Sequence, residues 1–270
     1  MDDAFALLCL QVEWGADEAL DSDPIDRLSP ADRLSPTDRP RPIESGPAFA
    51  RPASVPALPV GGQAERALAL AMQAATLDEL RATLASFDGC VLRDTASNLV
   101  FAEGKPASPI LIIGDPPGRE EDRSGHPFAG PEGQLLDQML ASIGLTRGEL
   151  MLTPLLPWRP PGGRPPSPAE IAICQPFLHR LITLLQPDRT VLFGGTAARS
   201  ILPNAQNRRR GPRGWVEAAI AGVRGTRPVL ALPGLGEMLK NPPLRRDAWT
   251  GLRLLRRSID ETPRPRVPQP

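Results

Sequence analysis

The stretch IIGDPPGREEDRSGHPFAGPEGQLLDQML, residues 112–140, decides the fold. It begins as an apolar run that stops at a Gly-Asp-Pro-Pro-Gly turn (residues 114–118), and it ends as an amphipathic helical pattern. Between them lie a charged segment and a second turn, residues 125–130, with one aromatic residue, Phe128. A buried strand followed by a covering helix is the unit of a parallel sheet. Ligands of such sheets bind at the carboxyl ends of the strands, where both turns begin.

The rest of the chain repeats this alternation. Apolar runs typical of buried strands cover residues 109–114, 149–156, 189–195 and 228–233. Helical patterns cover residues 63–85, 132–143, 168–186, 196–202 and 244–259. Thr76 with Glu79, and Ser167 with Glu170, have the spacing of capping boxes. We therefore predict an α/β protein, a three-layer α/β/α fold with a central four-stranded parallel sheet.

Composition divides the chain into four parts. Residues 1–20 have the pattern of an N-terminal helix. Residues 21–61 are rich in proline and charge, which predicts a disordered linker, because such a segment buries too little apolar surface to offset its ordering entropy. The folded domain is expected over residues 62–260, followed by a disordered tail over residues 261–270. A protein partner for the N-terminal helix and linker stays open.

Charge and hydropathy exclude several classes. The 31 basic and 31 acidic residues balance, which argues against general electrostatic capture of nucleic acid but not against a local basic patch. No run approaches about 18 apolar residues, so no membrane span is expected. The first residues do not fit a secretion signal, and three cysteines make no disulfide framework, so we expect a cytoplasmic protein.

Generic motifs do not specify an activity. The turn at residues 114–118 is neither the dinucleotide fingerprint nor a phosphate-binding loop. His126 and His179 have no partners at zinc-ligand spacing and form no evident triad with a serine. By these criteria a small-molecule or phosphate-binding α/β domain remains an alternative.

The order of longer blocks is more specific. They are LIIGDPPGREEDRSGHPFAGPEGQLLDQMLASIGL, MLTPLLPWRPPGGRPPSPAEIAICQPFL, LLQPDRTVLFGGTAARSIL, RGW and LPGLGEMLKNPPLRRDAW. This series resembles the uracil-DNA glycosylase superfamily, in particular its iron–sulfur family, family 4. The resemblance covers roughly residues 85–257 and is strongest in the first two blocks. It implies a DNA repair enzyme that binds a flipped uracil in DNA and hydrolyses its N-glycosidic bond.

The resemblance also implies site residues. The family's Gly-Glu-x-Pro-Gly turn, which lines the uracil pocket, is here residues 114–118, so Asp115 takes the catalytic position, and Gly114 and Gly118 line the pocket. The family's phenylalanine that stacks on the flipped base corresponds to Phe128. A plain core role for Phe128 stays open beside this one.

Two family residues are missing here. The asparagine that reads the uracil edge falls at Pro154, which has neither a side-chain amide nor a backbone N–H. The histidine that supports the leaving O2 falls at Gly234, and no histidine follows His179. Each such donor is worth about 10²–10³ in rate in comparable enzymes, so excision activity is in doubt. The alternative is a catalytically dead DNA-binding or protein-interaction module on the same fold.

The resemblance places four cluster ligands at positions 87, 90, 158 and 174. The chain has Phe87, Cys90, Trp158 and Cys174 there, whereas a 4Fe–4S cluster takes four cysteines. Because only Cys90 and Cys174 remain of the four ligands, we predict that no metal is bound. We expect aromatic packing to have replaced the cluster, leaving a domain without a cofactor.

Basic residues on loops after strand ends are the candidate DNA contacts. They are Arg159, Arg164, Arg210, Arg213 and Lys240. Phosphate contacts of this kind position a protein without reading sequence. The apolar residue that enters the base stack in the family has three candidates here, Leu235, Met238 and Leu239.

Overall fold

The computed structural model describes residues 60–202, 214–221, 223 and 225–261. All of them belong to one compact unit, Pro56–Pro270. The helix predicted over residues 1–20, nearly all of the linker predicted over residues 21–61 and the tail after residue 261 lie outside the described residues. No described helix is both long enough and apolar enough to cross a membrane.

One six-stranded sheet organises the unit, in the order β1-β3-β2-β4-β6-β5. Its four inner strands are parallel and are the four predicted from the sequence: β3 (Met151–Pro154), β2 (Ile110–Gly114), β4 (Arg189–Phe193) and β6 (Thr226–Leu232). Two strands not predicted from the sequence add antiparallel edges, β1 (Glu103–Gly104) beside β3 and β5 (Val216–Ala219) beside β6. The predicted α/β fold with a parallel central sheet is confirmed.

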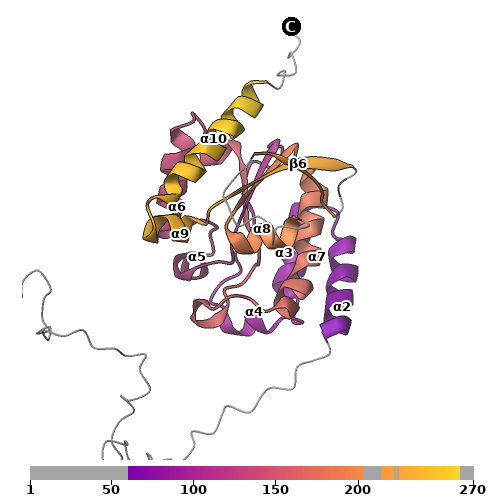
Figure 1. The fold of residues 1–270 in the computed structure, drawn as a ribbon. Coiled ribbons are helices and arrows are strands. Elements are labelled where there is room, and N and C mark those ends of the chain that lie inside the picture. Colours follow the sequence, from indigo (N-terminus) through magenta and orange to yellow (C-terminus); the bar gives the residue numbers. More distant parts are fainter. Residues whose placement is uncertain (1–59, 203–213, 222, 224, 262–270) are drawn as a thin grey trace, which may run out of the picture. The chain divides into compact units, whose positions relative to one another are not determined.

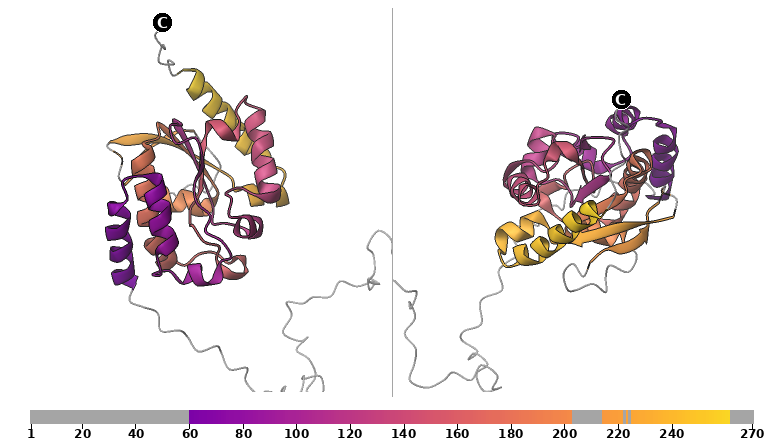
Figure 2. Two further views of the ribbon diagram at one scale, coloured as in Figure 1. Left: turned by 180° about the vertical axis from the view of Figure 1, so that it is seen from behind. Right: turned by 90° about the horizontal axis from the view of Figure 1, so that it is seen from above.

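Helices cover both faces of this sheet (Figures 1 and 2). One hydrophobic cluster joins Leu111 and Ile113 to helices α2 (Val60–Gln73), α3 (Leu77–Ser86), α7 (Pro168–Leu185) and α8 (Gly195–Ile201). The other joins Ile110 and Ile112 to helices α6 (Gly130–Ala141), α9 (Leu235–Lys240) and α10 (Leu244–Asp260). Alternate residues of β2 thus point into opposite layers, as the two-residue period of a strand requires.

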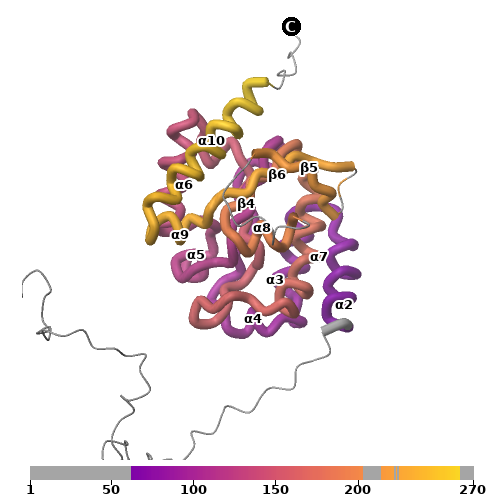
Figure 3. The backbone as a smooth tube through the Cα atoms, viewed as in Figure 1, coloured from indigo at the N-terminus to yellow at the C-terminus, as the bar shows by residue number. Residues whose placement is uncertain are grey.

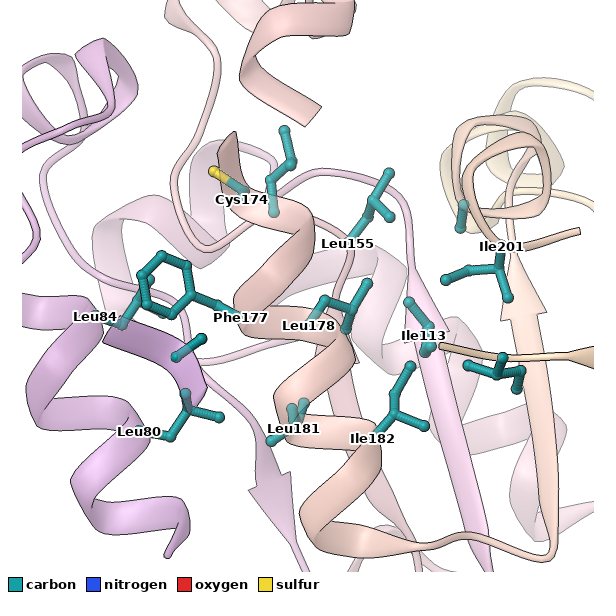
Figure 4. Packing of buried hydrophobic residues seen from close by; sticks show 14 of the residues in the cluster. Leu80, Leu84, Ile113, Leu155, Cys174, Phe177, Leu178, Leu181, Ile182 and Ile201 are labelled. Carbon is teal, nitrogen blue, oxygen red and sulfur yellow. The ribbon is translucent and has the colours of Figure 1, made fainter. Parts of the chain in front are cut away.

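Helix α7 fills most of one layer. Its apolar side lies against α3 and the sheet, where Phe177 and Leu181 meet Leu80 and Leu84 (Figure 4). Ser167 accepts a hydrogen bond from the Glu170 N–H at 3.2 Å, and the Glu170 carboxylate accepts one from the Ser167 N–H at 2.7 Å, so the predicted capping box is present. Each fully buried leucine contributes about 1.5–3 kcal/mol to folding, which makes this face the main anchor of the helix.

The remaining elements are short, and the backbone tube in Figure 3 shows how they link the layers. Helices α4 (Val91–Thr95) and α5 (Arg119–Ser124) and two 3₁₀ turns complete the described structure, the turns at Arg147–Glu149 and Pro161–Gly163. Helix α5 occupies the charged segment of the stretch at 112–140, and α9 occupies the segment after β6. Both therefore follow the carboxyl end of a parallel strand.

Candidate functional site

The carboxyl ends of the four parallel strands meet in one row. Gly114 at the end of β2 is in register with Pro154 of β3 on one side and with Phe193 of β4 on the other. Phe193 is in register with Leu232 of β6. The segments after these residues therefore lie side by side and form the candidate site.

Asp115 is the first residue beyond β2 and caps the helix after the neighbouring strand. Its Oδ1 accepts hydrogen bonds from the backbone N–H groups of Thr196, at 3.0 Å, and Ala197, at 2.9 Å, in the first turn of α8. Those two groups have no partner inside the helix, so a carboxylate satisfies them and complements the positive end of the helix dipole. The interaction fixes Asp115 between two strands.

Glycine is required beside this carboxylate. Gly194, just before α8, has a φ of +110°, and a Cβ built there would lie 2.1 Å from Asp115 Oδ2. A Cβ at Gly234 would lie 3.6 Å from the same oxygen and 3.4 Å from the Gly194 Cα. The second carboxylate oxygen of Asp115 thus faces Gly194 and Gly234, where no side chain intervenes.

The site is acidic around Asp115. Burial raises the pKa of the Asp115 carboxyl, and the charge of Glu237 raises it further, while the N–H groups of α8 and the charge of Arg199 oppose the shift. Burial also raises the pKa of Glu132 in α6, with contributions from the charges of Glu121 and Asp115, whereas Lys240 lowers it. Carboxylates so placed hold protons more tightly than in water.

Phe128 lies against the end of β2. Its ring carbons lie 2.8 Å from the position that a Cβ on Gly114 would take, so any side chain at Gly114 would collide with the ring. Phe128 is only 7% exposed and belongs to the cluster that covers one sheet face. Its φ of +52° is in the left-handed region, which bulky residues rarely adopt. The geometry brings Gly114, Asp115 and Phe128 together.

The Phe128 turn and the helix before it, α5, make contacts with other parts of the domain. His126 pairs with Glu103 of β1. Buried Asp122, in α5, accepts a hydrogen bond from the Ser97 N–H at 2.8 Å. Glu121 accepts one from the Gly118 N–H at 3.0 Å and so caps α5. Gly118 is predicted to line the pocket, and its amide is engaged in this cap.

The two positions without the expected donors have different surroundings. Pro154 is buried at the end of β3, and the next backbone N–H, that of Leu155, donates to the Gly114 carbonyl at 2.8 Å. Gly234 is the N-cap of α9, with φ −64° and ψ 142°. These angles are open to any residue. The Gly234 site thus accommodates a Cβ beside Asp115.

The predicted DNA contacts are differently placed. Arg164 donates to both oxygens of Glu170, at 2.6 and 2.9 Å, and this pairing lowers the pKa of Glu170. Lys240 is exposed at the end of α9, and Arg159 is partly buried after β3. Arg210 and Arg213 lie outside the described residues. Among the three candidate wedge residues, Leu235 and Met238 are buried, whereas Leu239 is 38% exposed.

Sequence reasoning missed four residues here: Arg147, Glu132, Arg199 and Glu237. Arg147 contacts the Phe128 turn from 19 residues away. The charges of Glu237 and Arg199 shift the pKa of Asp115, and the charge of Asp115 shifts that of Glu132. The only signal available was their occurrence within or next to the helices that flank the turns. A separate groove of about 560 Å³ lies on α10, lined by Trp249 and Arg253 among others, and includes none of the predicted site residues.

The four positions assigned to cluster ligands are all buried in one hydrophobic cluster. Phe87 packs edge to face on Phe177, with ring centroids 5.1 Å apart. The sulfurs of Cys90 and Cys174 are 3.8 Å apart. Contact with Cys90 and burial raise the pKa of Cys174.

Comparisons with known proteins agree on one family. The profile of the uracil DNA glycosylase superfamily matches residues 101–253, more than half of the chain. The chain is 39% identical over 126 residues to a type-4 uracil-DNA glycosylase of Archaeoglobus fulgidus, a match that covers 47% of this chain and 63% of the relative. Matches to enzymes of the same name are 34% identical over 126 residues in Pyrobaculum aerophilum and 38% over 108 residues in Thermotoga maritima. They cover 47% and 40% of this chain, and 64% and 56% of those relatives. The chain thus spans less than two thirds of these relatives.

These relatives correct the expectation of a domain without a cofactor. That expectation is contradicted, because the matched proteins are type-4 enzymes, which form the iron–sulfur class. The expectation rested on Phe87 and Trp158, which stand at two of the four ligand positions. The other two positions are still cysteines. A 4Fe–4S cluster takes four cysteines, and the described residues offer Cys90 and Cys174, while Cys9 lies outside them. The described residues alone do not complete that ligand set.

Proposed function

Because the chain belongs to the uracil DNA glycosylase superfamily, we propose that it is a DNA repair protein that binds a flipped uracil and hydrolyses its N-glycosidic bond. The observation that carries this proposal is the meeting of Phe128, Gly114 and Asp115 at the ends of the parallel strands. In such an arrangement the aromatic ring can stack on a base, and the fixed carboxylate can act on its sugar.

The first step is extrusion of the nucleotide. Taking a base out of a duplex costs a few kcal/mol, and stacking on an aromatic side chain returns about 1–3 kcal/mol. Phe128 supplies the aromatic ring in this proposal. Leu239, the exposed wedge candidate, would fill the gap left in the base stack, and Lys240 beside it would contact a phosphate.

The chemical step breaks the bond between C1′ of the sugar and N1 of uracil. The bonding electron pair leaves with uracil, a water oxygen bonds to C1′, and a proton of that water is released. The sugar becomes cationic in the transition state, and a carboxylate stabilises it or orients the water. Asp115 has this role: its Oδ1 is held by two amides of α8, so its position is preset, and its Oδ2 lies beside Gly234, which has no side chain.

The leaving uracil lacks two supports. No side-chain donor exists at Pro154 or Gly234. Because each donor contributes about 10²–10³ in rate, we propose that excision is slow. The same observation favours the second candidate function, a protein that holds a flipped nucleotide in DNA without cutting the glycosidic bond.

A single-turnover assay separates these functions. The full chain, in excess, is incubated with labelled single- and double-stranded oligonucleotides that contain one uracil, and abasic sites are cleaved with alkali. Phe128→Ala and Asp115→Asn run beside the wild type, and Arg257→Ala, whose ion pair with Glu261 lies on α10, is the control. Excision that both site variants weaken supports the enzyme. Retention of uracil DNA in a gel shift without excision supports the binding protein. If the protein shows neither excision nor retention, the proposal as a whole is contradicted.

A further inference from the structure

The unusual backbone of Phe128 needs an external restraint. The left-handed conformation costs an L-residue with a Cβ about 1–2 kcal/mol, and bulky residues adopt it only when the surroundings hold them. Phe128 and Gln186 are the two non-glycine residues with positive φ among those described. Gln186 ends α7, where a left-handed residue is common. Phe128 has no such ordinary reason.

Arg147 supplies the restraint. From the 3₁₀ turn after α6, its Nη2 donates to the Phe128 carbonyl at 2.7 Å and its Nη1 to the Pro127 carbonyl at 3.3 Å. Its Nε donates to Asp137 of α6 at 2.6 Å. The guanidinium thus joins α6 to two successive carbonyls of the turn. Its planar, fixed set of donors suits this task, which a lysine cannot reproduce.

Helix α6 leaves space for this contact. A Cβ at Gly133 would lie 1.7 Å from the Phe128 carbonyl oxygen and 2.6 Å from Arg147 Nη2. On its other side the Phe128 ring rests on Gly114. Phe128 is therefore confined between Gly114 at its ring and Gly133 with Arg147 at its carbonyl.

We infer that Arg147, anchored by Asp137, is a positioning residue that holds the Phe128 ring in place to receive a flipped base. The inference rests on the proposed function, since it assigns Phe128 the stacking role. Arg147 acts through Phe128 and touches neither the base nor a phosphate. Its loss therefore impairs the recognition of an extruded base and leaves the grip on ordinary duplex DNA intact.

Binding measurements test this division of roles. Arg147→Ala, Arg147→Lys and Asp137→Asn are compared with wild type for affinity to a duplex with one uracil and to the same duplex without it. We expect Arg147→Ala to weaken the uracil-dependent part by about 5- to 150-fold, the range for loss of an aromatic platform, with smaller losses for the other two. Affinity for the plain duplex should stay within about twofold. An equal loss on both duplexes would make Arg147 a phosphate contact and overturn the inference.

A double-mutant cycle with Phe128→Ala separates positioning from general stability. If Arg147 acts through Phe128, adding Arg147→Ala to Phe128→Ala changes uracil-dependent binding less than about twofold. Full additivity contradicts the inference. Arg257→Ala, which removes an exposed arginine ion pair elsewhere, is the matched control and should behave as wild type.

The backbone of Phe128 gives a readout independent of DNA. NMR chemical shifts and coupling constants that report φ should show Phe128 leaving the left-handed region in Arg147→Ala and retaining it in Arg257→Ala. If wild type neither binds nor excises uracil, the proposed function fails while this measurement still decides whether Arg147 restrains Phe128. An unchanged φ in Arg147→Ala refutes the restraint even in an active enzyme.

Discussion

Replacing Gly234 by histidine should raise the rate of uracil excision. A Cβ at this position meets its nearest neighbours at 3.4 Å, the Gly194 Cα, and at 3.6 Å, Asp115 Oδ2 and Glu237 Cγ. These are ordinary van der Waals distances, and the backbone angles of Gly234 suit any residue. The Cβ of the new side chain therefore fits without movement of the backbone. Because glycine loses more conformational entropy on folding, the change contributes about 0.4–1 kcal/mol of stability, less a few tenths for a poorer N-cap.

The size of the rate increase follows from the charge that develops on uracil. One donor aimed at a developing oxyanion is worth about 10²–10³ in rate, or about 2.7–4 kcal/mol. The new imidazole would lie between Asp115 and Glu237, and both carboxylates favour its protonated form, which raises its pKa above the usual value. We expect about a 10²-fold gain at pH 6. The gain should fade as pH rises through the raised pKa, because the neutral ring stabilises an anion less well.

The assay is single-turnover excision from pH 5 to pH 9, with melting temperatures measured on the same samples. Gly234→Ala is the matched control, because it adds the same Cβ without the ring, and its rate sets the baseline. If Gly234→His melts at or above the wild-type temperature and still excises no faster than Gly234→Ala, the leaving group does not form beside position 234. The reasoning for the site would then be wrong.

Three further changes test other parts of the site. Asp115→Asn keeps an oxygen for the amides of α8 but should lower excision by about 10²-fold or more. The same substitution should increase the stability of the fold. The pKa of Asp115 is raised, so the folded state binds its proton more tightly than the unfolded state does. Wild type therefore loses stability as pH rises from the unfolded pKa through the folded one. The variant should therefore melt higher than wild type at pH 7, with the advantage vanishing near pH 4, and an advantage that grows at low pH contradicts this. Gly194→Ala, with its Cβ 2.1 Å from Asp115 Oδ2, should lose about 1–3 kcal/mol, seen as a lower melting temperature, and more than Gly144→Ala, which also has positive φ but no neighbour within 4 Å. Pro154→Asn should tighten binding of free uracil by about tenfold in isothermal titration calorimetry, the worth of one hydrogen-bonding group of about 1.4 kcal/mol, and should leave affinity for plain duplex unchanged.

The inner sheet could be predicted because its signals are local. Strands β2 and β4 are buried on both faces over most of their length, and Ser167 with Glu170 marks a helix start within four residues. Helices α4, α5 and α9 have five or six residues, fewer than two turns, so no periodicity identifies them. Strand β1 has two residues and exists only because β3 offers it a partner. Such elements depend on tertiary contacts rather than on their own sequence.

The candidate site shows the same limit at the level of single contacts. The resemblance to a known family pointed to Asp115 and Phe128, but not to what holds them. Asp115 binds amides 81 residues further along, and this pairing follows from the adjacency of β2 and β4 in the sheet order. Arg164 was predicted to contact DNA, a role that stays a prediction, and its ion pair with Glu170 was not predicted from the sequence.

The two retained residues and the two missing donors belong to different parts of the reaction. In the proposed function, Phe128 would act on the face of the base and Asp115 on the sugar. Both are fixed by contacts that do not involve a ligand: Arg147 for Phe128, and the N-terminus of α8 for Asp115. The missing groups at Pro154 and Gly234 would act on the edge of the base and on the departing charge. Stacking tolerates any base, whereas edge contacts give selectivity. If the proposed function holds, a site with Phe128 and Asp115 but without the two donors should lose more selectivity and speed than affinity for an extruded nucleotide.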